Sequence, residues 1–142
     1  FQTPSRINST WGGNLVDMVR FDRILEIIEE DDLVSHAGEA GTHLQHRLHE
    51  LQDDFSIVEN VRGRGLMCAF DLTTVDIRDA VREHTFDEGA IVLGCGHRSI
   101  RFRSPLTITK DEIDRGIACL RRALETVTDA HPTGASASPT HA

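Results

Sequence analysis

Apolar residues recur every three or four positions between residues 14 and 30, with charged residues between them. This spacing places the apolar side chains on one face of an amphipathic helix, and Asn14 is suited to cap its first turn. Asp31 and Asp32 interrupt the pattern, after which four leucines and Ala37, spaced three, four or seven positions apart, predict a second helix over residues 33–51. We therefore expect two consecutive helices that meet at the two aspartates.

β-branched and alternating residues replace this pattern in the middle of the chain. Residues 57–61 and 66–72 predict two strands joined by a glycine turn at residues 63–65. A short helix is predicted to follow, capped by the hydroxyl of Thr73 or Thr74.

Two more strands are predicted before the last helix. Residues 90–93 form an apolar run of a length that suits a buried strand, and the glycines within residues 94–96 are expected to end it. Residues 99–103 alternate strictly, with two apolar side chains on one face and two arginines, Arg101 and Arg103, on the other. That alternation is typical of a strand with one buried side.

The last predicted helix has a clear start signal. Thr109 and Glu112 have the spacing of a capping box, and Ile108 stands where a hydrophobic staple begins. The apolar stripe expected on this helix consists of Ile113, Ile117, Leu120, Leu124 and Val127. Residues 128–142 contain no large apolar side chain, so they are predicted to form a disordered tail.

Composition narrows the functional classes. The chain has 142 residues, enough for one modest domain, and no uninterrupted apolar stretch long enough to cross a bilayer. Its formal net charge of -8 argues against a nucleic-acid partner, which requires a basic surface. Any anion must therefore be held by a local group of residues.

Cysteine and lysine usage add two constraints. The three cysteines, Cys68, Cys95 and Cys119, are an odd number without metal-binding spacing, which favours reduced thiols in a cytoplasmic protein. Lys110 is the single lysine among 15 basic residues, and at the start of an exposed helix it is a poor Schiff-base nucleophile. The chain begins at Phe1 without a methionine, so we expect a piece of a longer polypeptide.

Two groups of residues are candidates for binding an anion. Ser9 and Thr10, followed by a pair of glycines, stand directly before a predicted helix N-terminus, which favours a phosphate or carboxylate. The alternative is that they only form a turn and a cap. Arg101 and Arg103 offer planar guanidinium groups for a substrate carboxylate, and the alternative is that they are solvated arginines on the open side of a sheet.

Four histidines on the second predicted helix raise the question of a metal site. His36, His43, His46 and His49 are spaced so that neighbouring imidazoles could reach one ion. Carboxylates and arginines are mixed through the same helix, which favours an ordinary solvated face. We therefore expect no metal.

Three motifs together resemble a known family. Residues 9–14 (Ser-Thr-Trp-Gly-Gly-Asn), 63–67 (Gly-Arg-Gly-Leu-Met) and 100–109 (Ile-Arg-Phe-Arg-Ser-Pro-Leu-Thr-Ile-Thr) occur in the order and approximate spacing of the C-terminal third of class III, fold type I aminotransferases. These enzymes use pyridoxal 5'-phosphate. The resemblance extends to about Glu125, and residues 4–15 are most similar to the branch of the family that acts on the ε-amino group of L-lysine.

The resemblance implies an α+β fold, the small C-terminal domain of a fold type I aminotransferase. Its antiparallel sheet would have helices on one face and be preceded by a long interdomain helix. Residues 1–13 would form a loop from the end of the large domain, residues 14–53 the helical segment, residues 54–127 the small domain and residues 128–142 the tail.

The resemblance also implies roles for individual residues. Thr10, with Ser9 beside it, would bind the cofactor phosphate of the neighbouring subunit in a homodimer whose site is shared. Arg101 would bind the α-carboxylate of the amino acid or of 2-oxoglutarate, and Asn8 would reach the substrate from the same loop as Thr10. Arg103 varies among relatives and is the less favoured carboxylate partner.

The family's Schiff-base lysine, its pyridinium-binding aspartate and its glycine-rich phosphate loop lie upstream of the region that this chain resembles. We therefore expect no catalytic residue in the chain, and no activity of the chain alone. The implied reaction transfers the ε-amino group of L-lysine to 2-oxoglutarate. The alternatives are another class III aminotransferase, acting on ornithine, acetylornithine or 4-aminobutyrate, or a non-catalytic α+β binding module.

Overall fold

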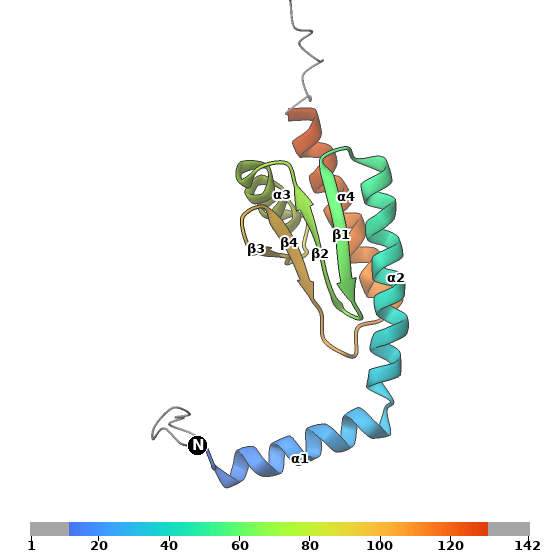
Figure 1. Ribbon diagram of the computed structural model, residues 1–142, viewed down its shortest axis with the longest axis vertical. Helices are drawn as coiled ribbons and strands as arrows, with labels where there is room; N and C mark the ends of the chain where they lie inside the picture. Colours follow the sequence, from blue (N-terminus) through green and yellow to red (C-terminus); the bar gives the residue numbers. More distant parts are fainter. Residues whose placement is uncertain (1–11, 131–142) are drawn as a thin grey trace, which may run out of the picture. The chain divides into compact units, whose positions relative to one another are not determined.

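The computed structural model describes residues 12–130. Its contacts divide the chain into two units, Phe1–Ser35 and His36–Ala142. The helices are α1 (Leu15–Glu30), α2 (Leu33–Asp54), α3 (Val75–Asp87) and α4 (Lys110–Ala130), and the strands are β1 (Val58–Arg64), β2 (Met67–Leu72), β3 (Leu93–Cys95) and β4 (Ser99–Arg103) (Figure 1). None of the helices in this described stretch has the length and apolarity needed to span a membrane.

The first unit contains α1, which forms where its hydrophobic periodicity predicts. The Asn14 side chain caps the helix by accepting a hydrogen bond of 3.0 Å from the backbone N–H of Val16. The backbone then breaks at Asp32, whose φ of 46° lies in the left-handed region, so the predicted junction at the aspartates is confirmed. None of the residues of α1 is buried, and its large apolar side chains are exposed except for Ile28, which is half-buried.

The second unit is built on a four-stranded antiparallel sheet with the strand order β1-β2-β4-β3. The predicted hairpin of the first two strands is confirmed, with one difference. β1 continues through Gly63 and Arg64, so the turn falls at Gly65 and Leu66 rather than at residues 63–65. The structure confirms the α+β class with an antiparallel sheet.

The strand predicted at residues 90–93 is wrong in position. β3 begins at Leu93 and includes Gly94 and Cys95, which were expected to end it, while Ile91 is 78% exposed. The bounds of β3 follow from its backbone pairing with β4, in which Leu93 lies opposite Arg101. The apolar run at residues 90–93 does not determine them.

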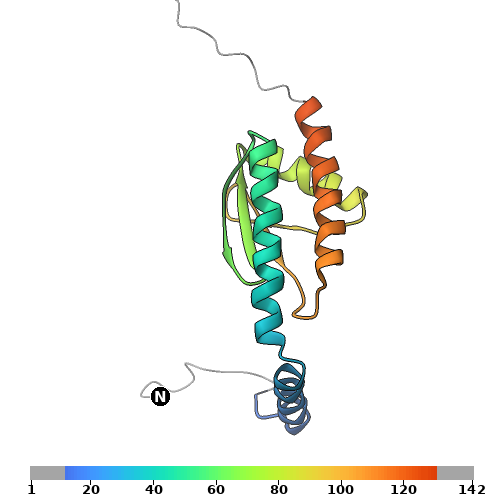
Figure 2. The same ribbon diagram turned by 90° about the vertical axis from the view of Figure 1, so that its right-hand side faces the viewer.

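Helices α2, α3 and α4 lie on the same face of the sheet, as Figure 2 shows, which confirms the predicted layer arrangement. The core lies between these layers and includes fully buried side chains from each of them. Representative members are Leu48 of α2, Phe70 of β2, Val81 of α3, Ile100 of β4 and Leu120 of α4. The C-terminal part of α2 thus packs in the same core as the sheet. The division of the chain at residues 13, 53 and 127 stays a prediction.

The capping box at the start of α4 is confirmed by its hydrogen bonds. The backbone N–H of Thr109 donates to the Glu112 carboxylate at 2.9 Å, and the Glu112 N–H donates to the Thr109 hydroxyl at 3.2 Å. All five residues of the predicted apolar stripe are buried. The helix continues through Ala130, so residues 128–130 are helical and not part of a tail. Residues 131–142 lie outside the described residues.

A close backbone approach fixes α2 against the β1–β2 turn. A Cβ atom added to Gly41 would lie 2.2 Å from the backbone carbonyl carbon of Gly65. Gly65 itself has a φ of +54°, which a side chain would disfavour. Two glycines therefore set the distance between the helix and the hairpin that presents Arg64.

Candidate functional site

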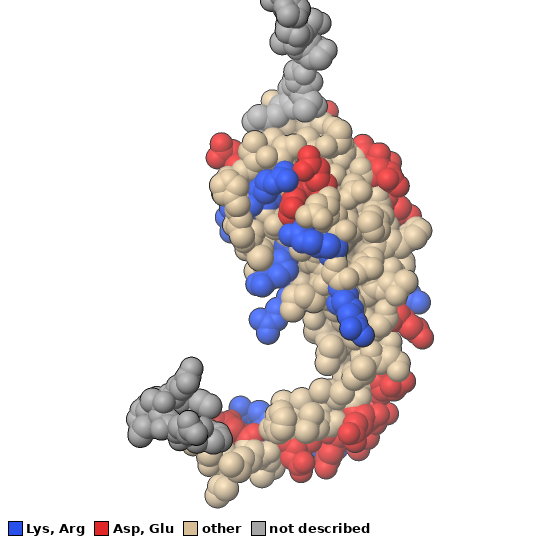
Figure 3. Space-filling model, in the orientation of Figure 1, with Lys and Arg blue, Asp and Glu red and all other residues tan. Residues whose placement is uncertain are grey.

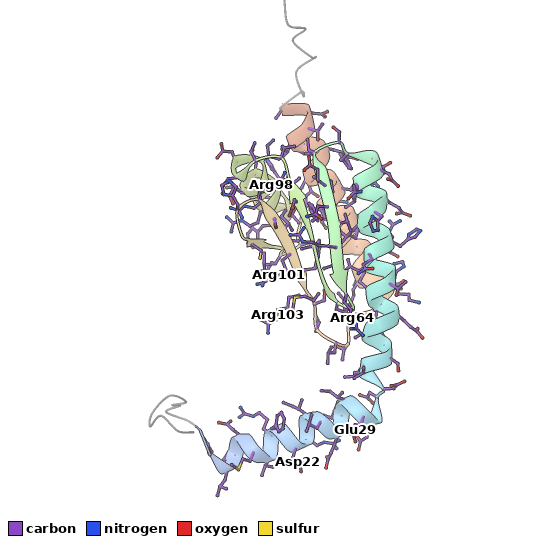
Figure 4. The ribbon with its side chains drawn as sticks, viewed as in Figure 1. Asp22, Glu29, Arg64, Arg98, Arg101 and Arg103 are labelled. Atoms are coloured by element: carbon purple, nitrogen blue, oxygen red, sulfur yellow. The ribbon has the colours of Figure 1, made fainter. Side chains whose placement is uncertain are left out.

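The face of the sheet opposite the helices carries the predicted substrate arginine. Along β2, the buried residues alternate with Met67, Ala69 and Asp71, which point to the open face. The antiparallel register places Ala69 beside Arg101 and Met67 beside Arg103, so both arginines project from the open face. Figure 4 shows the two side chains next to each other along β4.

Arg101 occupies the middle of this face. Its neighbours across the sheet are the small Ala69 on β2 and Leu93 on β3. The side chain is half-buried, and its Nε atom is buried without a hydrogen-bond partner among the described residues. It lines a hollow of about 390 Å³ together with Arg103, Pro105 and others. A half-buried guanidinium in such a hollow is suited to a planar carboxylate.

At one end of the face, arginines are paired with carboxylates. Arg62 lies 2.9 Å from Asp71, and Arg98 lies 2.9 Å from Glu59. Burial alone would raise the pKa of Asp71, but hydrogen bonds from Ser99, Asn60 and Arg62 outweigh it and lower this pKa to about 2. The charges at this end are thus largely satisfied within the sheet.

At the other end, the arginines have no such partners. Within residues 12–130, none of Arg64, Arg101 and Arg103 forms an ion pair with a carboxylate. Figure 3 shows the same asymmetry: blue side chains spread over the sheet face, whereas red ones lie among them only in the upper part of that face. The lower half of the face is a local positive surface on a chain of net charge -8.

The other predicted binding residues, Asn8, Ser9 and Thr10, lie outside the described residues. The described part of the chain begins shortly after them, where Gly13 has a φ of +81° and Asn14 caps α1. The cofactor roles of Ser9 and Thr10 and the substrate role of Asn8 therefore stay predictions.

Two of the four histidines of α2 contact other parts of the fold. His36 Nε2 lies 2.8 Å from the carbonyl oxygen of Ile108, and His43 Nε2 lies 2.9 Å from an Asp114 oxygen. In the described stretch, no group of three or more potential ligands could hold a metal ion. Lys110, the first residue of α4, is exposed.

Arg64 is a member of this face that the sequence pattern missed. It was assigned to a glycine turn, but the register places it opposite Met67, whose other neighbour is Arg103. The alternation of side chains along the hairpin could have found it. With the turn at Gly65 and Leu66, Arg64 pairs with Met67 and points to the open face, whereas Cys68 points to the buried one.

Comparisons with known proteins show the family of the chain. The family described as aminotransferase class-III matches residues 1–124. The chain belongs to the class III aminotransferases. It carries part of such a protein: it spans 29% of the length of the L-lysine-epsilon aminotransferases that it matches in Mycobacterium tuberculosis and Streptomyces clavuligerus.

The sequence identity to these relatives is substantial. The chain is 51% identical to the M. tuberculosis protein over 129 residues, which is 90% of this chain, and 42% identical to the S. clavuligerus protein over 131 residues, which is 91% of it. A solved structure of lysine aminotransferase from M. tuberculosis superposes with a TM-score of 0.81, covering 89% of this chain and 29% of that one. The structural neighbours of this class III chain are fold type I aminotransferases, as the motifs predicted.

Proposed function

We propose that the chain is the C-terminal portion of a pyridoxal-phosphate-dependent aminotransferase that transfers the ε-amino group of L-lysine to 2-oxoglutarate. The observation that carries this proposal is the position of Arg101, a half-buried guanidinium in a hollow of the open sheet face, without a carboxylate partner among the described residues. The choice of lysine is supported by relatives named L-lysine-epsilon aminotransferase at 42–51% identity.

In this proposal the residues of the chain bind and orient the substrate and the cofactor, and they supply no group that reacts. Arg101 holds a carboxylate of the amino acid or of 2-oxoglutarate, and Asn8 contributes from the loop before α1. Thr10 and Ser9 bind the cofactor phosphate of the neighbouring subunit in a homodimer. Pyridoxal phosphate, when bound, acts as an electron sink that lets a proton leave the substrate carbon.

The chain offers residues to bind the cofactor's phosphate, but it lacks a lysine suited to hold the cofactor covalently. Lys110 is the one lysine of the sequence, and it is exposed at the start of α4, where it lacks the burial that would activate its amine as a nucleophile. The amine that holds the cofactor must therefore come from other polypeptide. We place the protein in the cytoplasm, which suits the free thiols of Cys68, Cys95 and Cys119.

A chimera tests the proposal. This chain replaces the matching 129-residue segment of the M. tuberculosis relative, and glutamate formation from 2-oxoglutarate is measured with L-lysine, ornithine, acetylornithine or 4-aminobutyrate as donor. We expect turnover with lysine above the other donors. A folded, cofactor-loaded chimera that prefers another donor would assign that substrate instead, and one that transfers no amino group would contradict the enzymatic role.

The chain alone provides the complementary measurement. Purified chain with pyridoxal phosphate, L-lysine and 2-oxoglutarate should yield no glutamate, because no suitably activated lysine is present. Turnover by the chain alone would refute the assignment of chemistry to other polypeptide.

A further inference from the structure

We propose that His36 of α2 is a positioning residue for the substrate site. Its imidazole donates a hydrogen bond to the backbone of the connection between β4 and α4, residues 104–109, and so holds in place one wall of the hollow that contains Arg101. This inference rests on the proposed function for the role of that hollow. It adds a residue that acts on substrate binding without touching the substrate.

The connection between β4 and α4 forms a wall of two hollows on the open face. Ser104, Pro105 and Ile108 line the hollow of about 390 Å³ that contains Arg101. Ser104 and Pro105, together with Leu106, also line a second hollow of about 520 Å³. The surface that a substrate meets beside Arg101 therefore depends on where this connection lies.

The contacts that hold the connection are concentrated near its end. The Ile108 N–H donates to the carbonyl oxygen of Pro105 at 3.2 Å, and the Ile108 side chain packs against the core. Pro105 and Leu106 are exposed. Within residues 12–130, the hydrogen bond from His36 is the only one that joins residues 104–108 to a separate element, and Figure 1 shows the connection reaching α2 beyond the end of β4.

The hydrogen bond of His36 is short and lies in a half-buried place. Its Nε2 atom is 2.8 Å from the carbonyl oxygen of Ile108. A carbonyl oxygen only accepts, so Nε2 carries the proton and donates it. A buried acceptor that loses its partner costs more free energy than the hydrogen bond contributes on balance. A side chain without a donor at position 36 should therefore let the connection move.

The first turns of α2 are a firm support for this contact. Ala40, one turn after His36, is fully buried, and Gly41 lies against the backbone of Gly65 in the β1–β2 turn. Ala37, next to His36, lines the second hollow. One end of α2 thus holds the hairpin at one point and the connection at another, so it sets the distance between two sides of that hollow.

Two variants of His36 that differ mainly in the donor test the proposal in the chimera described above. His36→Gln keeps an N–H at a similar reach, whereas His36→Met has a comparable length, a similar helix propensity and no donor. We expect His36→Met to raise the KM for 2-oxoglutarate about threefold to tenfold and to leave kcat within about twofold, because a displaced wall weakens ground-state and transition-state binding alike. His36→Gln should restore most of the affinity.

A second histidine of the same helix provides the matched control. His43 contacts Asp114 in the body of α4 at 2.9 Å, outside residues 104–108. His43→Met therefore removes a contact of the same kind from α2, and it should lower the thermal stability without changing the KM. An equal rise in KM for His43→Met would show that loss of stability alone weakens binding, which would overturn the inference.

The isolated chain gives a readout that does not depend on turnover. The backbone NMR signals of residues 104–108 should lie further from their wild-type positions in His36→Met than in His36→Gln, because only the second variant keeps the donor. Both variants lose the imidazole ring, so the difference between them reports the hydrogen bond. Equal displacement in the two variants would overturn the claim that this hydrogen bond holds the connection.

The proposed function and this inference fail in different ways. Arg101→Gln is the reference for loss of the carboxylate contact, and Arg82→Gln, which removes the same charge from α3 on the covered side of the sheet, is its control. If Arg101→Gln lowers kcat/KM but His36→Met keeps the KM of the parent chimera, the positioning role is overturned and the role of Arg101 stands. If Arg101→Gln has no effect, the substrate role of this face is lost, and the positioning role with it, even where NMR shows that His36 holds the connection.

Discussion

Asp71 shows at the scale of one residue how the open face is organised. Its carboxylate accepts hydrogen bonds from Ser99 at 2.6 Å and from Asn60 at 2.9 Å, and it pairs with Arg62. These contacts join β1, β2 and β4 at the end of the face where charges are satisfied. They also keep this carboxylate away from Arg101 and Arg103, which leaves those arginines available to a ligand.

Replacing Asp71 by Asn should lower the free energy of unfolding at neutral pH by about 1–2 kcal/mol, since charge-assisted hydrogen bonds are lost. The pKa of Asp71 falls from its ordinary value of 3.8 to about 2 on folding. Its ionised form therefore stabilises the fold above about pH 4, and this contribution disappears as the pH falls towards 2.

Urea unfolding of both proteins between pH 2 and pH 7 measures this difference. The gap between wild type and Asp71→Asn should close as the pH falls, because Asp71 becomes neutral in the wild type too. A gap that is constant with pH would show that the ionised form of Asp71 contributes nothing.

Among the elements, α2 and the hairpin show how one contact positions the site. Gly41→Ala places a methyl group within 2.2 Å of the Gly65 backbone, which neither element can avoid without moving. We expect a loss of about 2–3 kcal/mol of stability. Gly38→Ala, on the same helix with nothing within 4 Å, should instead raise stability by up to about 1 kcal/mol.

Thermal unfolding compares these two glycine variants. If Gly41→Ala were as stable as Gly38→Ala, the close packing of α2 on the β1–β2 turn would be wrong. Because this turn presents Arg64, the Gly41 variant should also displace the NMR signals of β1 and β2, whereas the Gly38 variant should not.

Elements with strong local signals could be predicted from the sequence, and those defined by pairing could not. The capping box at Thr109 and the stripe of α4 depend on residues close together in the chain, so their pattern was sufficient. β3 depends on its register with β4, so its apolar run gave the wrong bounds. Arg64 was missed for the same reason, because the face of a residue near a turn changes when the turn moves by one position. Strict alternation was sufficient to place Arg101 on the open face, whereas its role in substrate binding was implied by the family resemblance and stays a prediction.

For the whole molecule, the apolar side chains of α1 are the feature that the described residues leave unexplained. Val19 is 72% exposed and Phe21 is 62% exposed, and no residue of the helix is buried. Exposed apolar patches of this kind mark surfaces that associate with other polypeptide. This agrees with a chain that spans 29% of the length of its relatives.

We expect the isolated chain to self-associate. Sedimentation at increasing concentration should show species larger than the monomer, and Val19→Ser combined with Leu25→Ser should shift the equilibrium towards the monomer. Replacing two exposed residues of the polar face, Asp22→Ser and Glu29→Ser, controls for a general effect of changing α1. A wild-type chain that stays monomeric at every concentration would contradict this expectation and favour an independent binding module.

The carboxylate role of Arg101 is tested most directly by steady-state kinetics of the chimera with Arg101→Gln. Loss of a charge-assisted carboxylate contact should lower kcat/KM for 2-oxoglutarate at least about 30-fold, whereas Arg82→Gln should leave it unchanged. Retention of the cofactor's absorbance in both variants shows that the fold and the cofactor site are intact. A kcat/KM for Arg101→Gln equal to that of the parent chimera would contradict the assignment of this face as the substrate site.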